Sequence, residues 1–142
     1  MSSGETVYNG LLAIIELMKE EEIKMNKLEE LGFELRHIGI NCADEEEACK
    51  VAGRFDEIFG FAKKVGNSSV FAGTAVEAMK KPYLGEKGHI AIGTADIEKA
   101  VAYLEEQGVE IDMETAKYKN EKLTAVYMKE EIGGFAVHLV QK

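Results

Sequence analysis

Three histidines and one glutamate lie at matching positions of an internal repeat, and together their side chains could do metal chemistry. His37 stands in the segment RHIGIN, and His89 stands 52 residues later in GHIAIG. Glu77 and His138 match one another in a second, weaker repeat with a spacing of 61 residues. Imidazoles and a carboxylate that converge would bind a borderline divalent ion such as zinc, nickel, cobalt, iron or manganese. The four residues are therefore candidates for one shared site.

Each of these residues also has an ordinary structural interpretation. A single histidine on a strand is commonly a core or surface residue, and Glu77 alone could be an exposed strand residue. Scattered placement, however, rarely puts every histidine of a chain at a repeat-matched position. The pattern therefore favours a metal site over four unrelated polar residues.

Other polar residues are weaker candidates. Strand alternation turns Arg36 to the face opposite His37, so we expect it to be a solvated charge. Ser69 fits a turn better than a nucleophile, because no histidine or aspartate partner is placed nearby in sequence. Tyr118 and Tyr127 either line the site or pack at its rim.

The repeat extends beyond these residues and predicts two βαβββ units. The identical pairs continue through Asp44 and Asp96, each of which is expected to begin a helix. The expected elements of the first unit are a strand at 33–41, a helix at 44–59 and strands at 61–65, 68–72 and 76–80. Those of the second unit are a strand at 87–93, a helix at 96–107 and strands at 109–113, 123–129 and 135–141, with a polar excursion at 118–122. One unit alone cannot bury its strand face, so the two units must pack together.

Residues 5–31 lie outside the repeat and predict a long helix with an apolar stripe. Gly32 is a suitable helix end. We expect a packing or dimerisation helix that covers the body. A lid over a site is the alternative, but no residue of the segment supports it.

Composition and charge narrow the function classes. The chain has 142 residues and a formal net charge of −9, which repels nucleic-acid backbones and anionic lipid surfaces. No apolar run is long enough for a bilayer span, and the first residues do not resemble a secretory signal. Only Cys42 and Cys49 are present, too few for a disulfide framework, so we predict a reduced, cytoplasmic protein with no nucleic-acid or membrane partner.

The repeated HIGI and GHIAIG segments and the closing GGFAVHLV resemble the vicinal oxygen chelate superfamily, which includes glyoxalase I, bleomycin resistance proteins and extradiol dioxygenases. The resemblance covers about residues 33–141, and the segment is also similar to the domain fused to keto-deoxy-phosphogluconate and keto-hydroxyglutarate aldolases. It implies an α+β fold with a cup-shaped mixed sheet over 33–142, in units 33–82 and 87–142, behind an N-terminal helix at 1–32.

The resemblance also implies a site and a class of reaction. Carried over by position, the family's metal ligands fall on His37, Glu77, His89 and His138, and Glu77 is the candidate catalytic base. His138 replaces the carboxylate that is usual at the last ligand position. The implied function is a divalent-metal-dependent isomerase, epimerase or lyase that acts on a small anionic or oxygen-rich carbonyl or hydroxy-acid metabolite, as a homodimer.

Two other functions remain open at this point. One is a non-catalytic small-molecule-binding module or aldolase-associated domain, which the missing carboxylate at His138 favours. The other is an extradiol-type dioxygenase, since two histidines and a carboxylate suit ferrous iron.

Overall fold

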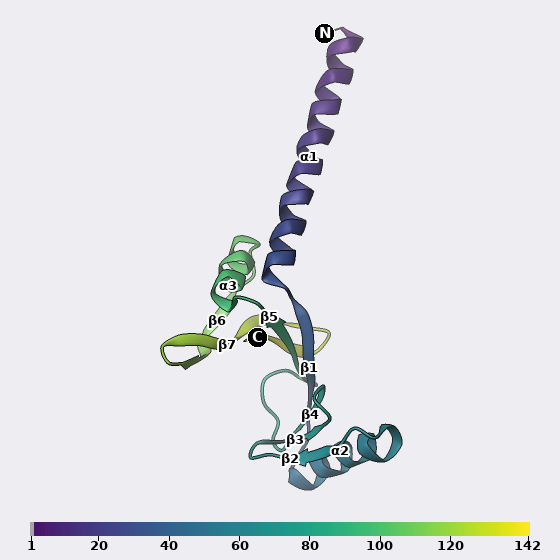
Figure 1. The fold of residues 1–142 in the computed structure, drawn as a ribbon, viewed down its shortest axis with the longest axis vertical. Coiled ribbons are helices and arrows are strands. Elements are labelled where there is room, and N and C mark those ends of the chain that lie inside the picture. Colours follow the sequence, from purple (N-terminus) through teal and green to yellow (C-terminus); the bar gives the residue numbers. More distant parts are fainter. Residues whose placement is uncertain (1) are drawn as a thin grey trace.

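The computed structural model describes residues 2–142 as a long N-terminal helix followed by an eight-stranded sheet with two further helices (Figure 1). The helices are α1 (Ser3–Leu31), α2 (Glu45–Phe59) and α3 (Ile97–Glu106). The strands of the first unit are β1 (Glu34–Asn41), β2 (Lys63–Val65), β3 (Ser69–Ala72) and β4 (Val76–Met79). Those of the second unit are β5 (Gly88–Thr94), β6 (Ile111–Lys119), β7 (Lys122–Ile132) and β8 (Phe135–Gln141). The α+β prediction with two βαβββ units is confirmed.

The eight strands form one open, mixed sheet in the order β2-β3-β4-β1-β5-β8-β7-β6. The first strands of the two units, β1 and β5, pair antiparallel at the centre. Each is flanked on its other side by the last strand of its own unit, in parallel: β4 beside β1, and β8 beside β5. The four central strands are therefore the four that carry the repeat-matched histidines and Glu77.

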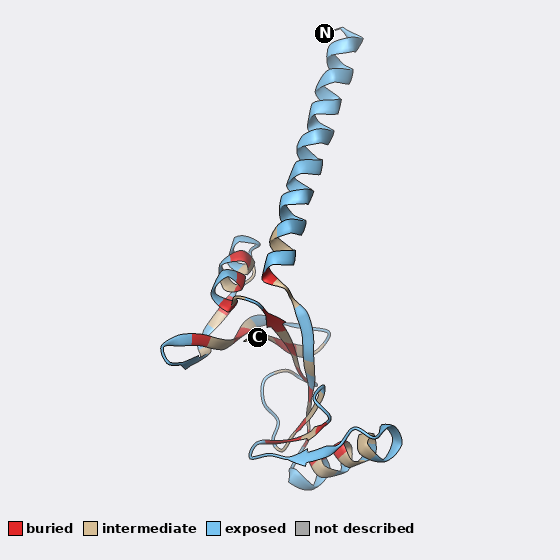
Figure 2. Cartoon of the chain, in the orientation of Figure 1, coloured by how far each residue is buried: buried red, intermediate tan, exposed pale blue. Residues whose placement is uncertain are grey.

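Each unit has its own helix and its own apolar core. α2 packs on β2, β3 and β4, and α3 packs on β6, β7 and β8, so that the two helices cover different halves of the sheet (Figure 1). Figure 2 shows the buried residues gathered in these two regions and along the central strands. The core under α2 is built mainly from small residues, including Ala48, Ala52 and Val70, whereas the core under α3 includes Ile97, Val126 and Leu139.

Both predicted helix starts are confirmed, and in each the aspartate side chain is the cap. Asp44 Oδ1 accepts a hydrogen bond from the Glu47 backbone N–H at 2.8 Å, and Asp96 Oδ1 accepts one from Lys99 at 3.1 Å. Glu47 in turn accepts a bond from the backbone N–H of Ala43 at 2.6 Å. These bonds satisfy donors that a helix N-terminus otherwise leaves free.

The prediction for residues 109–129 was wrong in one respect. The polar excursion expected at 118–122 is instead the tip of a long hairpin between β6 and β7, closed by Asn120 and Glu121. Both turn residues have positive φ, at 52° and 64°. That conformation matches the right-handed twist of the flanking strands, which continue to pair up to Lys119 and Lys122.

The helix expected at 5–31 is present, but it does not cover the body. α1 extends away from the sheet, and only its last turn contacts the rest of the chain (Figure 1). Leu31 is buried, and Leu28 packs against the α3 core. None of the helices in residues 2–142 combines the length and apolar composition that a membrane-spanning segment requires.

Candidate metal centre

Sheet register brings the four predicted residues to one place. In the central antiparallel pair, His37 lies opposite Ala91, and His89 lies opposite Gly39. Each histidine is therefore paired with a small residue of the neighbouring strand. In the flanking parallel pairs, Gly39 is the partner of Glu77 and Ala91 is the partner of His138. Glu77 and His138 therefore occupy equivalent positions in the two units.

The side chains of these residues converge on a small region over the central strands. The Nε2 atoms of His37 and His89 are 3.1 Å apart. Glu77 Oε1 lies 3.0 Å from His89 Nε2 and 3.5 Å from His37 Nε2. One ring nitrogen from each of His37, His89 and His138 lies within 4.8 Å of the corresponding nitrogens of the other two. The three imidazoles thus form one cluster, and the Glu77 carboxylate adjoins it through its contacts with His37 and His89.

Glu77 is held as an anion by three donors. Besides its contacts with the two histidines, its Oε2 accepts a hydrogen bond from Ser69 Oγ at 2.9 Å. Burial raises the pKa of the Glu77 carboxyl, but hydrogen bonds from His37, His89 and Ser69 outweigh this effect and hold its pKa well below its ordinary value. Glu77 is therefore a permanent anion near neutral pH and a weak base.

His138 is a neutral imidazole with an unused nitrogen. Burial, followed by the proximity of His89 and His37, lowers its pKa to about 3. Its ring stacks on Tyr127, with centroids 4.5 Å apart and planes 17° from parallel. Nε2 of His138 is buried and has no hydrogen-bond partner among residues 2–142, which is costly unless another ligand uses the lone pair.

Gly39 makes room for the most buried of these rings. His89 is only 3% exposed, and its imidazole lies directly over Gly39. A Cβ atom at Gly39 would stand 2.0 Å from His89 Cε1. No side chain larger than hydrogen fits there without moving the His89 ring.

The family model of the Glyoxalase/Bleomycin resistance protein/Dioxygenase superfamily matches residues 13–139. The chain belongs to this superfamily. Its resemblance to the vicinal oxygen chelate proteins is thereby confirmed. A comparison with curated protein sequences found no match.

Solved structures of similar fold include several methylmalonyl-CoA epimerases. A selenomethionine methylmalonyl-CoA epimerase is 18% identical, with a TM-score of 0.53 over 75% of this chain and 93% of that one. A variant of the Streptomyces coelicolor enzyme in complex with 2-nitronate-propionyl-CoA is 17% identical, with a TM-score of 0.54 over 77% and 94%. A hypothetical protein from Bacillus halodurans C-125 is 16% identical, with a TM-score of 0.53 over 78% and 95%. At these identities the likeness concerns the fold.

The residues of this superfamily member fit a divalent metal ion. Histidine nitrogens and a carboxylate oxygen are the donors that zinc and similar ions prefer. The buried, unpartnered Nε2 of His138 is accounted for if it is directed at an ion. Nδ1 of His89 is also buried, and within the described part of the chain it lacks the outer hydrogen bond that usually orients a metal-bound histidine.

Ser69 and Gly39 were not among the predicted site residues. Ser69 was interpreted as a turn residue, but it begins β3, is 5% exposed and donates to Glu77. Gly39 carries no functional group, although strand alternation from His37 places it on the same face. Tyr127, left open between site and rim, packs on the His138 ring.

A hollow of about 770 Å³ adjoins the centre on the side of His37. It lies between β1 and β3, and its lining includes Phe71, Arg36 and Lys64. Arg36, which was expected to face away as a solvated charge, is exposed but borders this hollow, next to a register shift in β1.

Proposed function

We propose that the protein is a divalent-metal-dependent epimerase, isomerase or lyase that acts on a small anionic metabolite at a carbon next to a carbonyl group. The observation that carries the proposal is the cluster of His37, His89 and His138, which has a buried and unused nitrogen on His138. Glu77 adjoins this cluster, with its Oε1 atom 3.0 Å from His89 Nε2. His89 is buried and the other three residues are half-buried, and polar groups in such surroundings are costly unless they are hydrogen-bonded or bind a cation.

In this proposal the four side chains would hold the ion, and the ion would supply Lewis-acid chemistry at a substrate carbonyl oxygen. Ser69 fixes Oε2 of Glu77, so that Oε1 is the oxygen directed at the histidines. Glu77 remains the proposed proton acceptor. Its low pKa, however, limits its strength as a base and suits a ligand role better.

The hollow beside His37 is the proposed binding place for the substrate. Its volume lies in the range of small-molecule sites. Its lining carries two cations, Arg36 and Lys64, against one carboxylate, Glu34, which pairs with Arg36 at 3.5 Å. These features support an anionic substrate. Because several proteins of similar fold are methylmalonyl-CoA epimerases, epimerisation next to a thioester is the first reaction to test.

Metal analysis tests the site. Protein purified without chelator is expected to carry close to one equivalent of a divalent ion, and His89→Ala is expected to lose most of it. Glu77→Gln is expected to bind weakly, whereas Glu114→Gln, which changes an exposed carboxylate on β6, serves as the matched control. Equal and negligible metal in all four proteins would contradict the proposal.

Proton exchange tests the chemistry. Methylmalonyl-CoA incubated in D2O with the metal-loaded protein is expected to lose its methine proton signal faster than the buffer control. Glu77→Gln should abolish the acceleration, and Glu114→Gln should retain it. Failure to exchange any of a set of anionic carbonyl compounds, despite full metal loading, would contradict the enzymatic function but not the metal site.

A non-catalytic binding module is the second candidate. The low pKa of the Glu77 carboxyl group favours it, because a carboxylate with a low pKa is a weak base. Neither Glu77 nor the neutral His138 is a good base at neutral pH. Isothermal titration distinguishes the two functions: tight ligand binding that is unchanged by chelator supports the module, whereas binding that requires metal supports the enzyme.

We also propose a reducing, cytoplasmic setting, because Cys42 and Cys49 are both free thiols. The proposed homodimer depends on α1 rather than on the four-residue cluster.

A further inference from the structure

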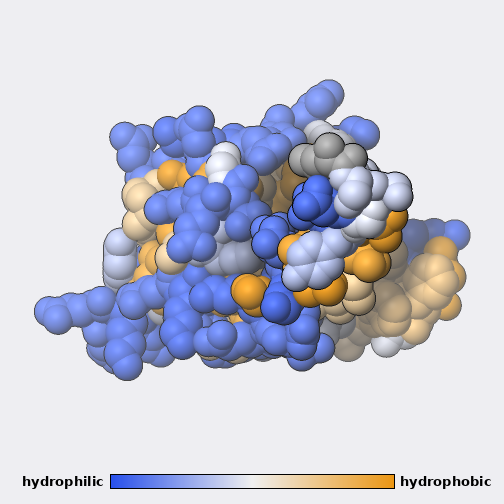
Figure 3. All heavy atoms as spheres, turned by 90° about the horizontal axis from the view of Figure 1, so that it is seen from above, coloured by the Kyte–Doolittle hydropathy of each residue, from blue (hydrophilic) through white to orange (hydrophobic). Residues whose placement is uncertain are grey.

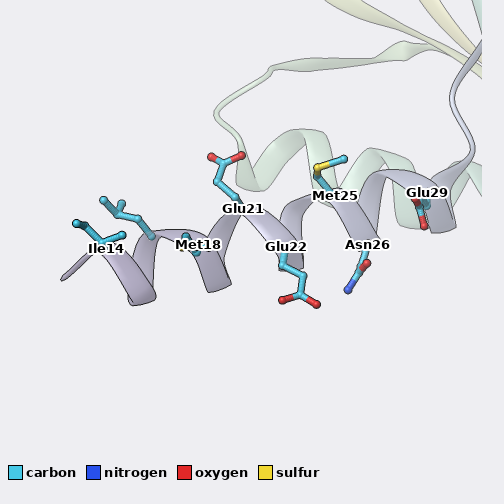
Figure 4. A pocket seen from close by; sticks show the side chains of 8 residues that line it. Ile14, Met18, Glu21, Glu22, Met25, Asn26 and Glu29 are labelled. Carbon is cyan, nitrogen blue, oxygen red and sulfur yellow. The ribbon is translucent and has the colours of Figure 1, made fainter. Parts of the chain in front are cut away.

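The N-terminal helix α1 presents an apolar surface that its own chain leaves uncovered. Leu31 is its only buried residue. Along the rest of the helix, Leu11, Ile14 and Met18 are 54%, 54% and 66% exposed. Figure 4 shows the stretch from Ile14 to Glu29, where a hollow of about 590 Å³ is lined by α1 residues alone. In the view from the N-terminal end, hydrophobic atoms are exposed around this helix (Figure 3).

The apolar residues of α1 follow a seven-residue repeat. The spacing alternates between four and three through a seam made of Val7, Leu11, Ile14, Met18 and Met25, interrupted only by Glu21. Two helices that wind around one another require this spacing, because it keeps the seam facing the partner helix. Tyr8, Ile15 and Leu17 flank the seam and widen it over the first half of the helix.

The exposed area of the chain is too large for a compact monomer. The chain exposes 9556 Å², whereas a compact monomer of its 15.7 kDa mass exposes roughly 7,300 Å². A stable protein–protein interface removes roughly 800 Å² from each partner, and obligate homodimers remove more. The excess on this chain is therefore large enough for a permanent interface.

We propose that α1 of one chain packs along α1 of a second copy, so that this helix is the homodimer interface. A heptad seam is complementary to another heptad seam, and a two-fold pair uses the same surface on both chains. An anionic lipid surface suits the helix poorly, since α1 carries seven glutamates in all and only three lysines. The proposal is independent of the metal site.

Paired isoleucine substitutions test this surface. Ile14 lies in the seam, whereas Ile23 lies on the opposite side of the same helix and is 68% exposed. In sedimentation equilibrium the wild-type chain is expected to be a dimer. Ile14→Asp is expected to raise the dimer dissociation constant at least 100-fold, and Ile23→Asp is expected to leave it within a few-fold of the wild-type value.

The helix itself needs a separate readout, because an unpartnered helix of this kind can unfold. Far-UV circular dichroism of Ile14→Asp at a concentration where it is monomeric, together with the cooperative unfolding of its sheet, shows whether the body stays folded. A monomeric wild-type chain would overturn the proposal. So would a dimer that both variants leave intact, or one that both disrupt equally.

Discussion

At the scale of single residues, Glu77 and His138 occupy equivalent places but have opposite surroundings. Glu77 is surrounded by donors, which keep it charged. Burial, and then the two imidazoles beside it, lower the pKa of His138 and keep it neutral, while its ring stacks on Tyr127. The duplicated fold thus supplies one anionic and one neutral donor on the two sides of the central histidine pair. A divalent ion bound by such a set would keep a net positive charge and could still attract an anionic ligand.

Ser69 is predicted to control metal affinity through Glu77. Ser69→Ala removes the one side-chain hydrogen bond to Oε2 found within residues 2–142, so the carboxylate is no longer fixed in orientation. Loss of such an outer contact typically weakens metal binding by roughly 10–100-fold. Titration with Co²⁺, followed by visible absorption, measures the effect. Ser68→Ala, at the exposed neighbouring position, should bind like the wild type, and an unchanged affinity in Ser69→Ala would contradict the positioning role.

The metal-free protein is predicted to lose stability on mild acidification because of His138. Its pKa is about 3 in the folded chain, against an ordinary value of 6.5. Below pH 6.5 the unfolded chain therefore binds a proton that the folded chain does not bind, and the free energy of unfolding falls as the pH falls towards 3. Between pH 7.5 and pH 5 this group accounts for a loss on the order of 2 kcal/mol.

Urea unfolding of chelator-treated protein at several pH values measures this slope. His138→Gln removes the titrating group and is expected to flatten the curve between pH 7.5 and pH 5. Glu77 contributes its own loss only as the pH falls below its ordinary value of 4.5, outside this interval. A variant whose slope equals that of the wild type would show that His138 is not the cause.

At the scale of elements, the β6–β7 hairpin carries backbone strain at its tip. Glu121 has a φ of 64°, a conformation in which a residue with a side chain costs about 1–2 kcal/mol. Glu121→Gly is predicted to relieve this strain and to raise the free energy of unfolding by about 0.5–1 kcal/mol, since part of the gain is lost to the flexibility of glycine when unfolded.

The matched control for this prediction lies on the same hairpin. Glu130 is exposed and extended within β7, so Glu130→Gly should lower the free energy of unfolding by about 0.5–1 kcal/mol. Thermal unfolding of both variants decides between the two signs. Equal destabilisation by both glycines would mean that the turn conformation is not strained.

The same hairpin shows where the sequence was insufficient. Alternation, helix stripes and aspartate caps were strong signals, and the βαβββ order and the central strands were predicted correctly from them. The tip was not, because Asn120 is followed by glutamate rather than by the glycine that usually marks a two-residue turn. The internal repeat was the basis for predicting that the four candidate side chains share one site. Ser69 and Gly39 were not predicted as site residues, because their roles depend on neighbours in adjacent strands that the order of the sequence does not reveal.

At the scale of the whole molecule, α1 shows what a sequence pattern alone does not predict. Its apolar stripe correctly predicted a helix but not what the helix packs against. An apolar stripe indicates that one face of a helix is buried against a partner. It does not indicate whether that partner belongs to the same chain or to another copy. Only the arrangement in space, with α1 directed away from both cores, separates the two outcomes (Figure 1).

A bound ion is predicted to stabilise the molecule as a whole, because its four proposed ligands come from both units. Each unit has its own core, and the sheet joins the two units through the β1–β5 pair. Saturation with Zn²⁺ at 100 times its dissociation constant is expected to add about 2.7 kcal/mol to the free energy of unfolding. For a chain of this length, that gain corresponds to a rise in melting temperature of roughly 8 °C. Chelator should reverse the rise, Glu77→Gln should largely abolish it, and Glu114→Gln should retain it.

Hydrogen exchange should slow in β4 and in β8 alike. Protection confined to one unit would show that the ion does not join the two halves.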